Sequence, residues 1–177
     1  MERFELARRI YDCAHLTGTF LLRSGKTSHE YFDKYQFESD PKLLKEIAKG
    51  LVPLIPAGTD YLGALEMGGI PIATALSFET GIPVVFVRKE AKEYGTCKFA
   101  EGPAIKGKRL TLVEDVITTG GQVVISANDL RTEGALIENV LCVIDRSEGQ
   151  TQKIEEAGLK HRALFTMAEL KKAGENK

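Results

Sequence analysis

The stretch RLTLVEDVITTGG, from Arg109 to Gly121, sets the pattern for much of the chain. Residues 109–113 are mainly apolar, which is typical of a buried strand. Two carboxylates, Glu114 and Asp115, follow directly, and a run of threonine and glycine then leads into a helical pattern over about 121–133. A strand, a polar turn and a helix in this order form the repeating unit of a parallel α/β sheet.

Short apolar strands alternate with helices from residue 41 onward, which predicts an α/β fold with a mainly parallel sheet flanked by helices. Residues 3–16, 19–22 and 31–35 indicate one helix and two strands that do not follow this alternation. We therefore expect one domain, residues 1–177, made of a small N-terminal hood over about 1–40 and a core over about 41–177. The other expected strands are 61–65, 84–87 and 140–144, and the other expected helices are about 41–52, 69–79 and 150–157.

Composition excludes several classes of protein. The 177 residues are 43% hydrophobic, enough for a core, and their net charge of −1 lacks the basic excess of a nucleic-acid binder. No apolar run approaches the roughly 20 residues of a membrane helix, and the N-terminus does not resemble a signal peptide. The three cysteines, Cys13, Cys97 and Cys142, form no CxxC pair. We expect a cytoplasmic protein with reduced thiols and with no nucleic-acid or membrane partner.

The segment after residue 113 has chemistry suited to a phosphorylated sugar. Helix N-terminal N–H groups attract a phosphate, and Gly120 and Gly121 allow the backbone to approach it closely. Threonine hydroxyls add hydrogen bonds, and adjacent carboxylates suit ribose hydroxyls or a Mg²⁺ ion carried by a polyphosphate. Taken alone, the segment could equally be an ordinary strand–helix turn in which Thr119 is only the N-cap.

Taken together, the apolar strand, the acidic pair and the Thr-Gly run resemble the loop with which type I phosphoribosyltransferases bind phosphoribosyl pyrophosphate (PRPP). The resemblance implies that fold, with Glu114 and Asp115 on the ribose hydroxyls and residues 118–121 around the 5-phosphate. It is not a Walker loop, because no Gly-Lys-Ser/Thr is present. The PRPP-binding residues implied here are Glu114, Asp115, Val116, Ile117, Thr118, Thr119, Gly120, Gly121 and Gln122.

A long basic segment follows the expected strand 84–87. Alone it could be a solvated charged hairpin, but its pattern resembles the mobile catalytic loop of the orotate phosphoribosyltransferases. Lysines and an arginine there would stabilise the charge that grows on the pyrophosphate leaving group. The resemblance implies catalytic roles for Lys92, Arg88 and Lys89, and PRPP contacts for these three residues and Tyr94. Tyr94 stands where many members have histidine, and a phenol cannot titrate near neutral pH.

The segment from Phe20 to Asp33 is similar to the N-terminal signature of the same family. The resemblance places Arg23 near orotate and the pyrophosphate, and Tyr31 and Phe32 beside the pyrimidine ring, where aromatic faces suit a flat heterocycle. Neighbouring residues of a strand face opposite ways, so we expect one of the two aromatic side chains to belong to the core. His29 is expected at the surface.

Arg146 follows the expected strand 140–144. A guanidinium group is the natural partner of the carboxylate that orotate carries and uracil lacks. Alone, Arg146 could be a surface residue paired with Asp145 or Glu148. The family resemblance implies instead that Arg146 contacts the carboxylate and that Thr118 also touches the base.

The run from Glu66 to Pro71 corresponds to another loop of this family. Some members place a lysine directly before Gly-Ile-Pro, where this chain has Gly68. A cationic contact from that position is therefore absent. Backbone N–H groups of Gly68 and Gly69 could still receive pyrophosphate oxygens, and a tight turn into a helix explains the glycines equally well.

Apart from the run Glu66–Pro71, the four motifs stand in the family's order and predict an enzyme that joins orotate to the ribose 5-phosphate of PRPP. Mg²⁺ is expected as the cofactor, carried by PRPP and without direct protein ligands. The family's basic loop reaches the neighbouring subunit, which implies a homodimer with shared active sites. A phosphoribosyltransferase for another base and a PRPP-binding regulator remain as alternatives. The intact basic loop, and the lack of a visible nucleic-acid-binding surface or extra domain, argue against the regulator.

Lys92→Ala is expected mainly to lower kcat, because the contact of this lysine should strengthen as charge grows on the leaving pyrophosphate. Steady-state kinetics with both substrates varied would measure the effect. An unchanged kcat in the mutant would refute the catalytic assignment.

Overall fold

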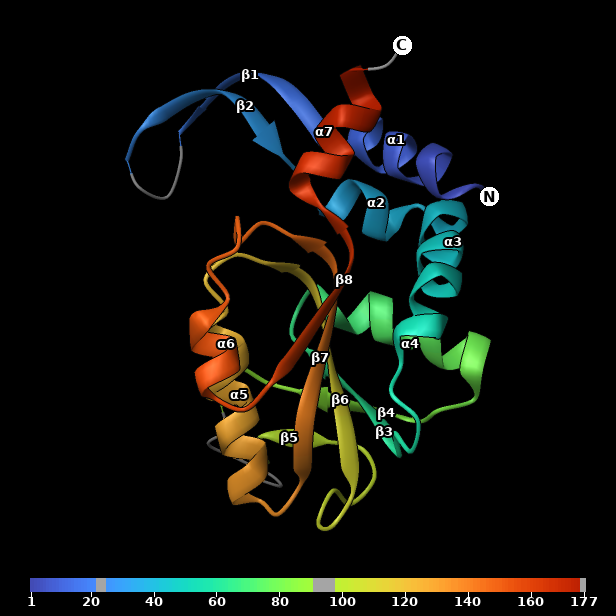
Figure 1. Cartoon of the computed structure of the whole chain (residues 1–177), viewed down its shortest axis with the longest axis vertical. Helices are drawn as coiled ribbons and strands as arrows, with labels where there is room; N and C mark the ends of the chain where they lie inside the picture. Colours follow the sequence, from blue (N-terminus) through green and yellow to red (C-terminus); the bar gives the residue numbers. More distant parts are fainter. Residues whose placement is uncertain (22–24, 91–97, 176–177) are drawn as a thin grey trace.

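The computed structural model describes residues 1–21, 25–90 and 98–175, and its centre is a six-stranded sheet (Figure 1). The strand order is β5-β4-β3-β6-β7-β8. All neighbours pair in parallel except β4 and the short β5, which are antiparallel. The strands are β3 (Tyr61–Leu65), β4 (Val84–Val87), β5 (Ala100–Glu101), β6 (Arg109–Ile117), β7 (Leu136–Asp145) and β8 (Lys160–Thr166).

Helices cover the sheet on both faces, which confirms the expected fold class. Figure 1 shows α5 and α6 on one side of the sheet and α3 and α4 on the other. The Asp40 carboxylate caps α3 by accepting from the N–H groups of Lys42 and Leu43 at 2.8 and 3.1 Å. The covering helices are α3 (Pro41–Leu51), followed by the 3₁₀ turn η1 (Val52–Leu54), α4 (Gly69–Thr80), α5 (Gly121–Thr132) and α6 (Gln152–Glu156).

A separate layer, the hood, lies across one end of the sheet (Figure 1). Its antiparallel hairpin pairs His15 with Phe32 at the base and Leu21 with Thr27 near the tip. The hood consists of α1 (Arg3–Ala14), β1 (His15–Leu21), β2 (Thr27–Phe32), α2 (Tyr35–Ser39) and, from the other end of the chain, α7 (Met167–Glu175). Arg3 ties α1 to α7 through an ion pair with Glu169 at 2.8 Å.

Several expectations about element boundaries were wrong. The second hairpin strand ends at Phe32 instead of continuing to residue 35, because the Asp33 carboxylate accepts from the backbone N–H of Tyr35 and α2 begins there. The strand that includes the acidic pair extends to Ile117. Strand β8 and helix α7 were not expected at all. Only Leu164 and Phe165 of β8 are fully buried, so its apolar pattern is short and interrupted.

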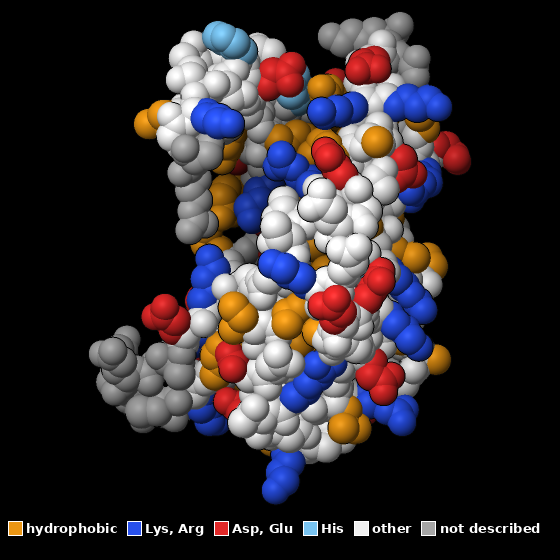
Figure 2. All heavy atoms as spheres, turned by 60° about the vertical axis from the view of Figure 1, so that its left-hand side comes forward, with side chains coloured by type: hydrophobic (Ala, Val, Ile, Leu, Met, Phe, Trp, Pro, Cys, Tyr) orange, Lys and Arg blue, Asp and Glu red, His pale blue; other side chains and the backbone are white. Residues whose placement is uncertain are grey.

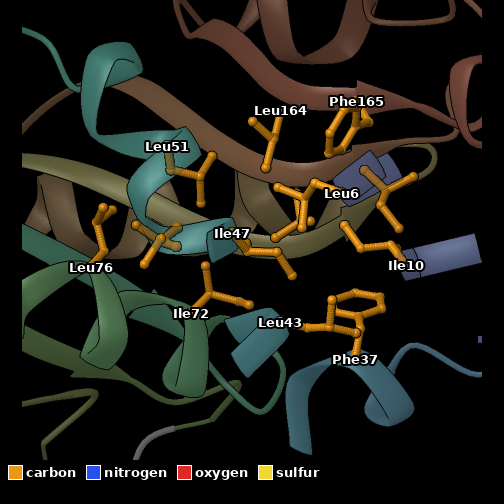
Figure 3. Packing of buried hydrophobic residues seen from close by; sticks show 14 of the residues in the cluster. Leu6, Ile10, Phe37, Leu43, Ile47, Leu51, Ile72, Leu76, Leu164 and Phe165 are labelled. Atoms are coloured by element: carbon orange, nitrogen blue, oxygen red, sulfur yellow. The ribbon is translucent and has the colours of Figure 1, made fainter. Parts of the chain in front are cut away.

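Apolar side chains from the hood and the sheet layer form one continuous cluster (Figure 3). Ile10 of α1 and Phe37 of α2 pack there with Ile47 of α3 and Ile72 of α4, and all four are completely buried. Burial of large side chains on both sides of this junction holds the hood against the end of the sheet. A second cluster fills the opposite face of the sheet, under α5 and α6.

Helix α7 packs against α1 at Gly174, where a Cβ atom would overlap the ring of Tyr11. Gly174→Ala should therefore lower the free energy of unfolding by about 1–3 kcal/mol through overpacking, although alanine favours helices intrinsically. Urea denaturation would measure the change. Ala168→Val adds bulk at an exposed position of the same helix and serves as the control. A stabilised Gly174→Ala variant would contradict the close packing of the two helices.

Candidate active site

The carboxyl ends of β6 and β7 lie side by side, so the residues that follow them meet. Ile117 pairs with Asp145 in the parallel register, and the backbone N–H of Arg146 donates to the carbonyl of Ile117 at 2.8 Å. Thr118 and Arg146 therefore leave adjacent strands at the same edge. The open sheet directs both residues toward the crevice where ligands bind in such folds.

A cavity of about 650 Å³ opens between this edge and the hood. Figure 2 looks onto the side of the molecule where the hood faces the sheet layer, with lysine and arginine side chains gathered around the hollow. Five of the residues predicted from the sequence line the cavity, namely Tyr31, Phe32, Val116, Thr118 and Arg146. The structure thus brings the N-terminal signature, the acidic-Thr-Gly loop and the strand-end arginine to one place.

The two aromatic residues of the signature occupy different surroundings. Phe32 is half-buried and packs on the hood–sheet cluster, as expected for one of the pair. Tyr31 is 46% exposed, and its ring lies 5.5 Å from the ring of Phe20. Both side chains nevertheless border the cavity and offer apolar surface to a flat ligand. His29 is exposed, as expected.

The Thr-Gly loop leaves the start of α5 open. Gly120 is the N-cap residue with φ of 70°, and no side chain caps the helix within the described part of the chain. A Cβ at Gly120 would lie 2.5 Å from the Ile154 side chain, so glycine is required there for both conformation and space. Thr118 and Thr119 are exposed and directly precede this open helix start, an arrangement that suits an anion.

The other residues predicted in this loop, Val116, Ile117 and Gln122, differ in which of their groups could contact a ligand. Val116 is half-buried and borders the cavity, whereas the Ile117 side chain lies in the core and its carbonyl already accepts from Arg146. Ile117 could therefore contact a ligand only through its main chain. Gln122 is exposed on the first turn of α5, and its side-chain amide nitrogen lies 3.4 Å from the hydroxyl of Ser126.

Three carboxyl groups and one ammonium group meet at the base of the loop. The Asp115 side chain is 1% exposed, and its Oδ2 atom lies 2.5 Å from Lys34 Nζ. The backbone N–H of Val116 donates to Oδ1 of Asp115 at 2.5 Å. Glu38, from the hood helix α2, is also buried, and its carboxyl group interacts with that of Asp115. Lys34 and Glu38 belong to no motif, and no sequence pattern pointed to either residue.

This crowding separates the pKa values of the three acids. Burial raises the pKa of Glu38 to about 9, reinforced by its hydrogen bond to Asp115 and by the Asp115 charge. Burial and the charge of Asp115 raise the pKa of Glu114 to about 8. Burial also opposes ionisation of Asp115, but hydrogen bonds from Glu114, Glu38 and Lys34 outweigh it, so its pKa falls. Asp115 is thus the ionised member of the group near neutral pH.

The structure describes only the first residues of the basic segment, up to residue 90. Lys89 donates its backbone N–H to the Glu66 carboxylate at 2.6 Å, and Arg88 Nε lies 3.5 Å from the Glu101 carboxylate. Neither Arg88 nor Lys89 lines the cavity. Lys92, Tyr94 and Arg23 lie outside the described residues.

Gly68 and Gly69 form the tight entry to α4. A Cβ at Gly68 would overlap the Asp115 carboxylate, and one at Gly69 would overlap the carbonyl oxygen of Val113. These overlaps explain both glycines sterically. Gly68 is also the N-cap residue of α4, and no side chain within the described residues caps this helix.

Within residues 1–21, 25–90 and 98–175, no three histidine, cysteine, aspartate or glutamate side chains are grouped to hold a metal ion. No helix in the same ranges combines the length and the apolar character needed to cross a membrane.

The fold and the strand-end loop place the chain in the class of type I phosphoribosyltransferases. The orotate phosphoribosyltransferase of Mycobacterium tuberculosis H37Rv, solved in complex with PRPP, superposes with a TM-score of 0.81 at 27% identity, covering 96% of this chain and 98% of that one. The Aeropyrum pernix enzyme gives 0.82 at 29% identity, covering 97% and 99%.

Sequence comparison narrows the class to one family. No family model matches the chain. An orotate phosphoribosyltransferase of Nocardioides sp. is 54% identical over 170 residues, covering 96% of this chain and 95% of the relative. One of Methanocella arvoryzae is 42% identical over 153 residues, covering 86% and 87%. The chain belongs to the orotate phosphoribosyltransferase family.

The raised pKa of Glu38 predicts a pH-dependent stability. Its protonated form stabilises the fold fully below about pH 4.5, and this contribution is lost as pH rises through about 9. The free energy of unfolding of the wild type should fall between about pH 6 and pH 9. In Glu38→Gln this fall should be smaller by about 1–3 kcal/mol. Urea denaturation at both pH values would measure it, with the exposed Glu138→Gln as control. Equal pH dependence in wild type and Glu38→Gln would contradict the buried carboxylic acid.

Proposed function

We propose that the chain transfers the 5-phosphoribosyl group of PRPP to N1 of orotate, releasing pyrophosphate and forming orotidine 5′-phosphate for pyrimidine biosynthesis. The observation that carries the proposal is the convergence of Thr118, Arg146 and the aromatic pair Tyr31–Phe32 on one cavity. These groups come from three separate sequence motifs, and together they match an anion, a carboxylate and a flat ring. Membership of the orotate phosphoribosyltransferase family supports the same reaction.

PRPP would bind with its 5-phosphate at the start of α5. The uncapped N–H groups and the hydroxyls of Thr118 and Thr119 supply donors, and Gly120 allows close approach. The ribose hydroxyls would then reach the acidic pair, where Asp115 is ionised and Glu114 carries a raised pKa. In this placement C1 of the ribose would face the cavity.

Orotate would lie in the cavity between the hairpin and the end of β7. Arg146 would pair with its carboxylate, Tyr31 and Phe32 would border the ring, and Thr118 would contact the base edge. Arg23 is proposed as a further contact near the pyrophosphate. Holding N1 beside C1 of PRPP is the main contribution of these groups, because bond breaking leads and no protein nucleophile is needed.

The basic segment would stabilise the leaving pyrophosphate. Lys92 is the proposed principal catalytic residue, with Arg88 and Lys89 next and Tyr94 as an additional donor. The start of this segment is fixed by the backbone contact of Lys89 with Glu66, at the end of β4 and outside the cavity. A loop that serves the neighbouring subunit fits this position, so we propose a cytoplasmic homodimer with shared active sites.

Mg²⁺ is the proposed cofactor and would arrive on PRPP. Hard oxygen donors suit this ion, and the ionised Asp115 of the acidic pair supplies negative charge at the position proposed for the ribose. When bound, the ion neutralises diphosphate charge and favours departure of the leaving group. The protein's own groups orient the two substrates and exclude water.

Purified protein with PRPP, Mg²⁺ and orotate would test the function through the loss of orotate absorbance. The proposal expects turnover that requires both PRPP and Mg²⁺, with none for uracil or purine bases. Turnover of another base alone would discard the assignment of orotate. PRPP binding without turnover of any base would indicate a regulator.

Arg146→Gln should raise KM for orotate by about 10- to 100-fold, because a charge-assisted contact to the carboxylate is lost. KM for PRPP should change little. Arg162→Gln is a matched control, since Arg162 is exposed and donates to the carbonyl of Leu54 at 3.0 Å, away from the cavity. Equal KM values for orotate in Arg146→Gln and wild type would remove Arg146 from the binding site.

A further inference from the structure

Lys34 stands where the hood meets the acidic pair. It precedes α2 directly, and its Nζ atom reaches across to Asp115 Oδ2 at 2.5 Å. The side chain is 34% exposed and borders the cavity together with Thr118 and Arg146. One lysine of the hood therefore touches both the proposed ribose carboxylate and the space in which substrates would lie.

Both oxygens of Asp115 are held in place. The Val116 N–H donates to Oδ1, and the Lys34 ammonium group contacts Oδ2. A carboxylate oxygen has two acceptor sites, so each oxygen has one beyond these two contacts. Glu38 and Glu114 can use these sites in the free protein, and ribose hydroxyls would take them when PRPP binds. Two ribose hydroxyls are a natural match for two such acceptors. Without Lys34, Oδ2 would lose its cationic partner, whereas Oδ1 would keep the N–H of Val116.

The absence of a side chain at Gly68 belongs to the same arrangement. A Cβ at that position would overlap Asp115 Oδ2, the oxygen that Lys34 contacts. The present position of Asp115 is thus compatible with glycine at 68 and with a cation arriving from the hood. Any larger residue at position 68 would require Asp115 to move.

The charges around Lys34 favour its ion pair with Asp115. Burial lowers the pKa of Lys34, but its hydrogen bond to Asp115 and the charge of that residue outweigh burial, so the pKa is raised. Besides Asp115, the groups that face the ammonium are Glu114 on β6, Glu38 on α2 and the Tyr35 ring at 5.3 Å. Lys34 therefore stays protonated among three carboxyl groups.

We propose that Lys34 is a positioning residue for PRPP: from the hood, it holds the Asp115 carboxylate in the orientation that receives the ribose hydroxyls. The inference rests on the proposed function for the identity of the ligand. It makes seating of the hood on the sheet a condition for tight PRPP binding. The lysine acts through Asp115, while the diphosphate is left to the basic segment.

Binding of PRPP without orotate tests the inference, by calorimetry on Lys34→Met, Lys34→Arg and wild type. Loss of the anchor should weaken PRPP binding by at least about tenfold in Lys34→Met, while Lys34→Arg stays within about threefold of wild type. In turnover, KM for PRPP should rise with little change in KM for orotate. Lys49→Met is the control, because Lys49 forms an ion pair with Glu46 at 2.8 Å outside the cavity.

A double-mutant cycle with Asp115→Asn separates positioning from direct contact. If Lys34 acts through Asp115, adding Lys34→Met to Asp115→Asn should weaken PRPP binding no further. Additive losses would overturn the inference, because Lys34 would then bind PRPP itself. Unchanged PRPP affinity in folded Lys34→Met would overturn it as well and leave a purely structural ion pair. Should Lys34→Met fail to fold, Lys34→Gln carries the same expectations.

Measurements on the wild-type protein separate a failure of this inference from a failure of the proposed function. PRPP binding without orotate turnover would refute the proposed reaction, and the comparison of Lys34 variants would still decide the inference. Failure of the wild type to bind PRPP would overturn both. Circular dichroism of each variant shows whether a lost affinity reflects a lost fold.

Discussion

The parallel pairing of β6 with β7 is the constraint on which the site depends. Because the two strands run in the same direction, their ends release Thr118 and Arg146 at one edge of the sheet. The hydrogen bond from the Arg146 N–H to the Ile117 carbonyl extends the pairing by one residue beyond β7. The sites proposed for a phosphate and for a carboxylate are thereby set at a fixed spacing by backbone geometry, and side chains add the chemistry.

Close packing then determines which residues can stand around that edge. Gly120 faces Ile154, and Gly68 faces Asp115, so side chains are excluded where the backbone turns beneath the loop. The buried Asp115 is tolerated because the Val116 N–H and the Lys34 ammonium group compensate its lost hydration. Glu38 and Glu114 respond to the same crowding by favouring their protonated forms.

The hood is assembled from both ends of the chain. Helix α7 packs on α1 through the contact of Gly174 with Tyr11 and the ion pair between Arg3 and Glu169. This pairing places Met167 and Lys171 of α7 on the cavity wall, beside residues of the N-terminal hairpin. The C-terminal helix therefore completes the cavity, although its sequence shows no motif. Hydrophobic burial between α1, α2 and α3 keeps this layer on the sheet.

The sequence by itself determined the α/β alternation, the acidic-Thr-Gly loop and the aromatic pair, because apolar periodicity and turn residues act over short distances. It missed β8, α7 and the extension of β6, where pairing with neighbouring strands or packing against α1 decides the structure. Only the tertiary structure brought Lys34 and Glu38 to Asp115, since that contact joins residues about 80 positions apart. A charge pattern in α2 cannot indicate a distant partner, because such contacts depend on how the hood seats on the sheet.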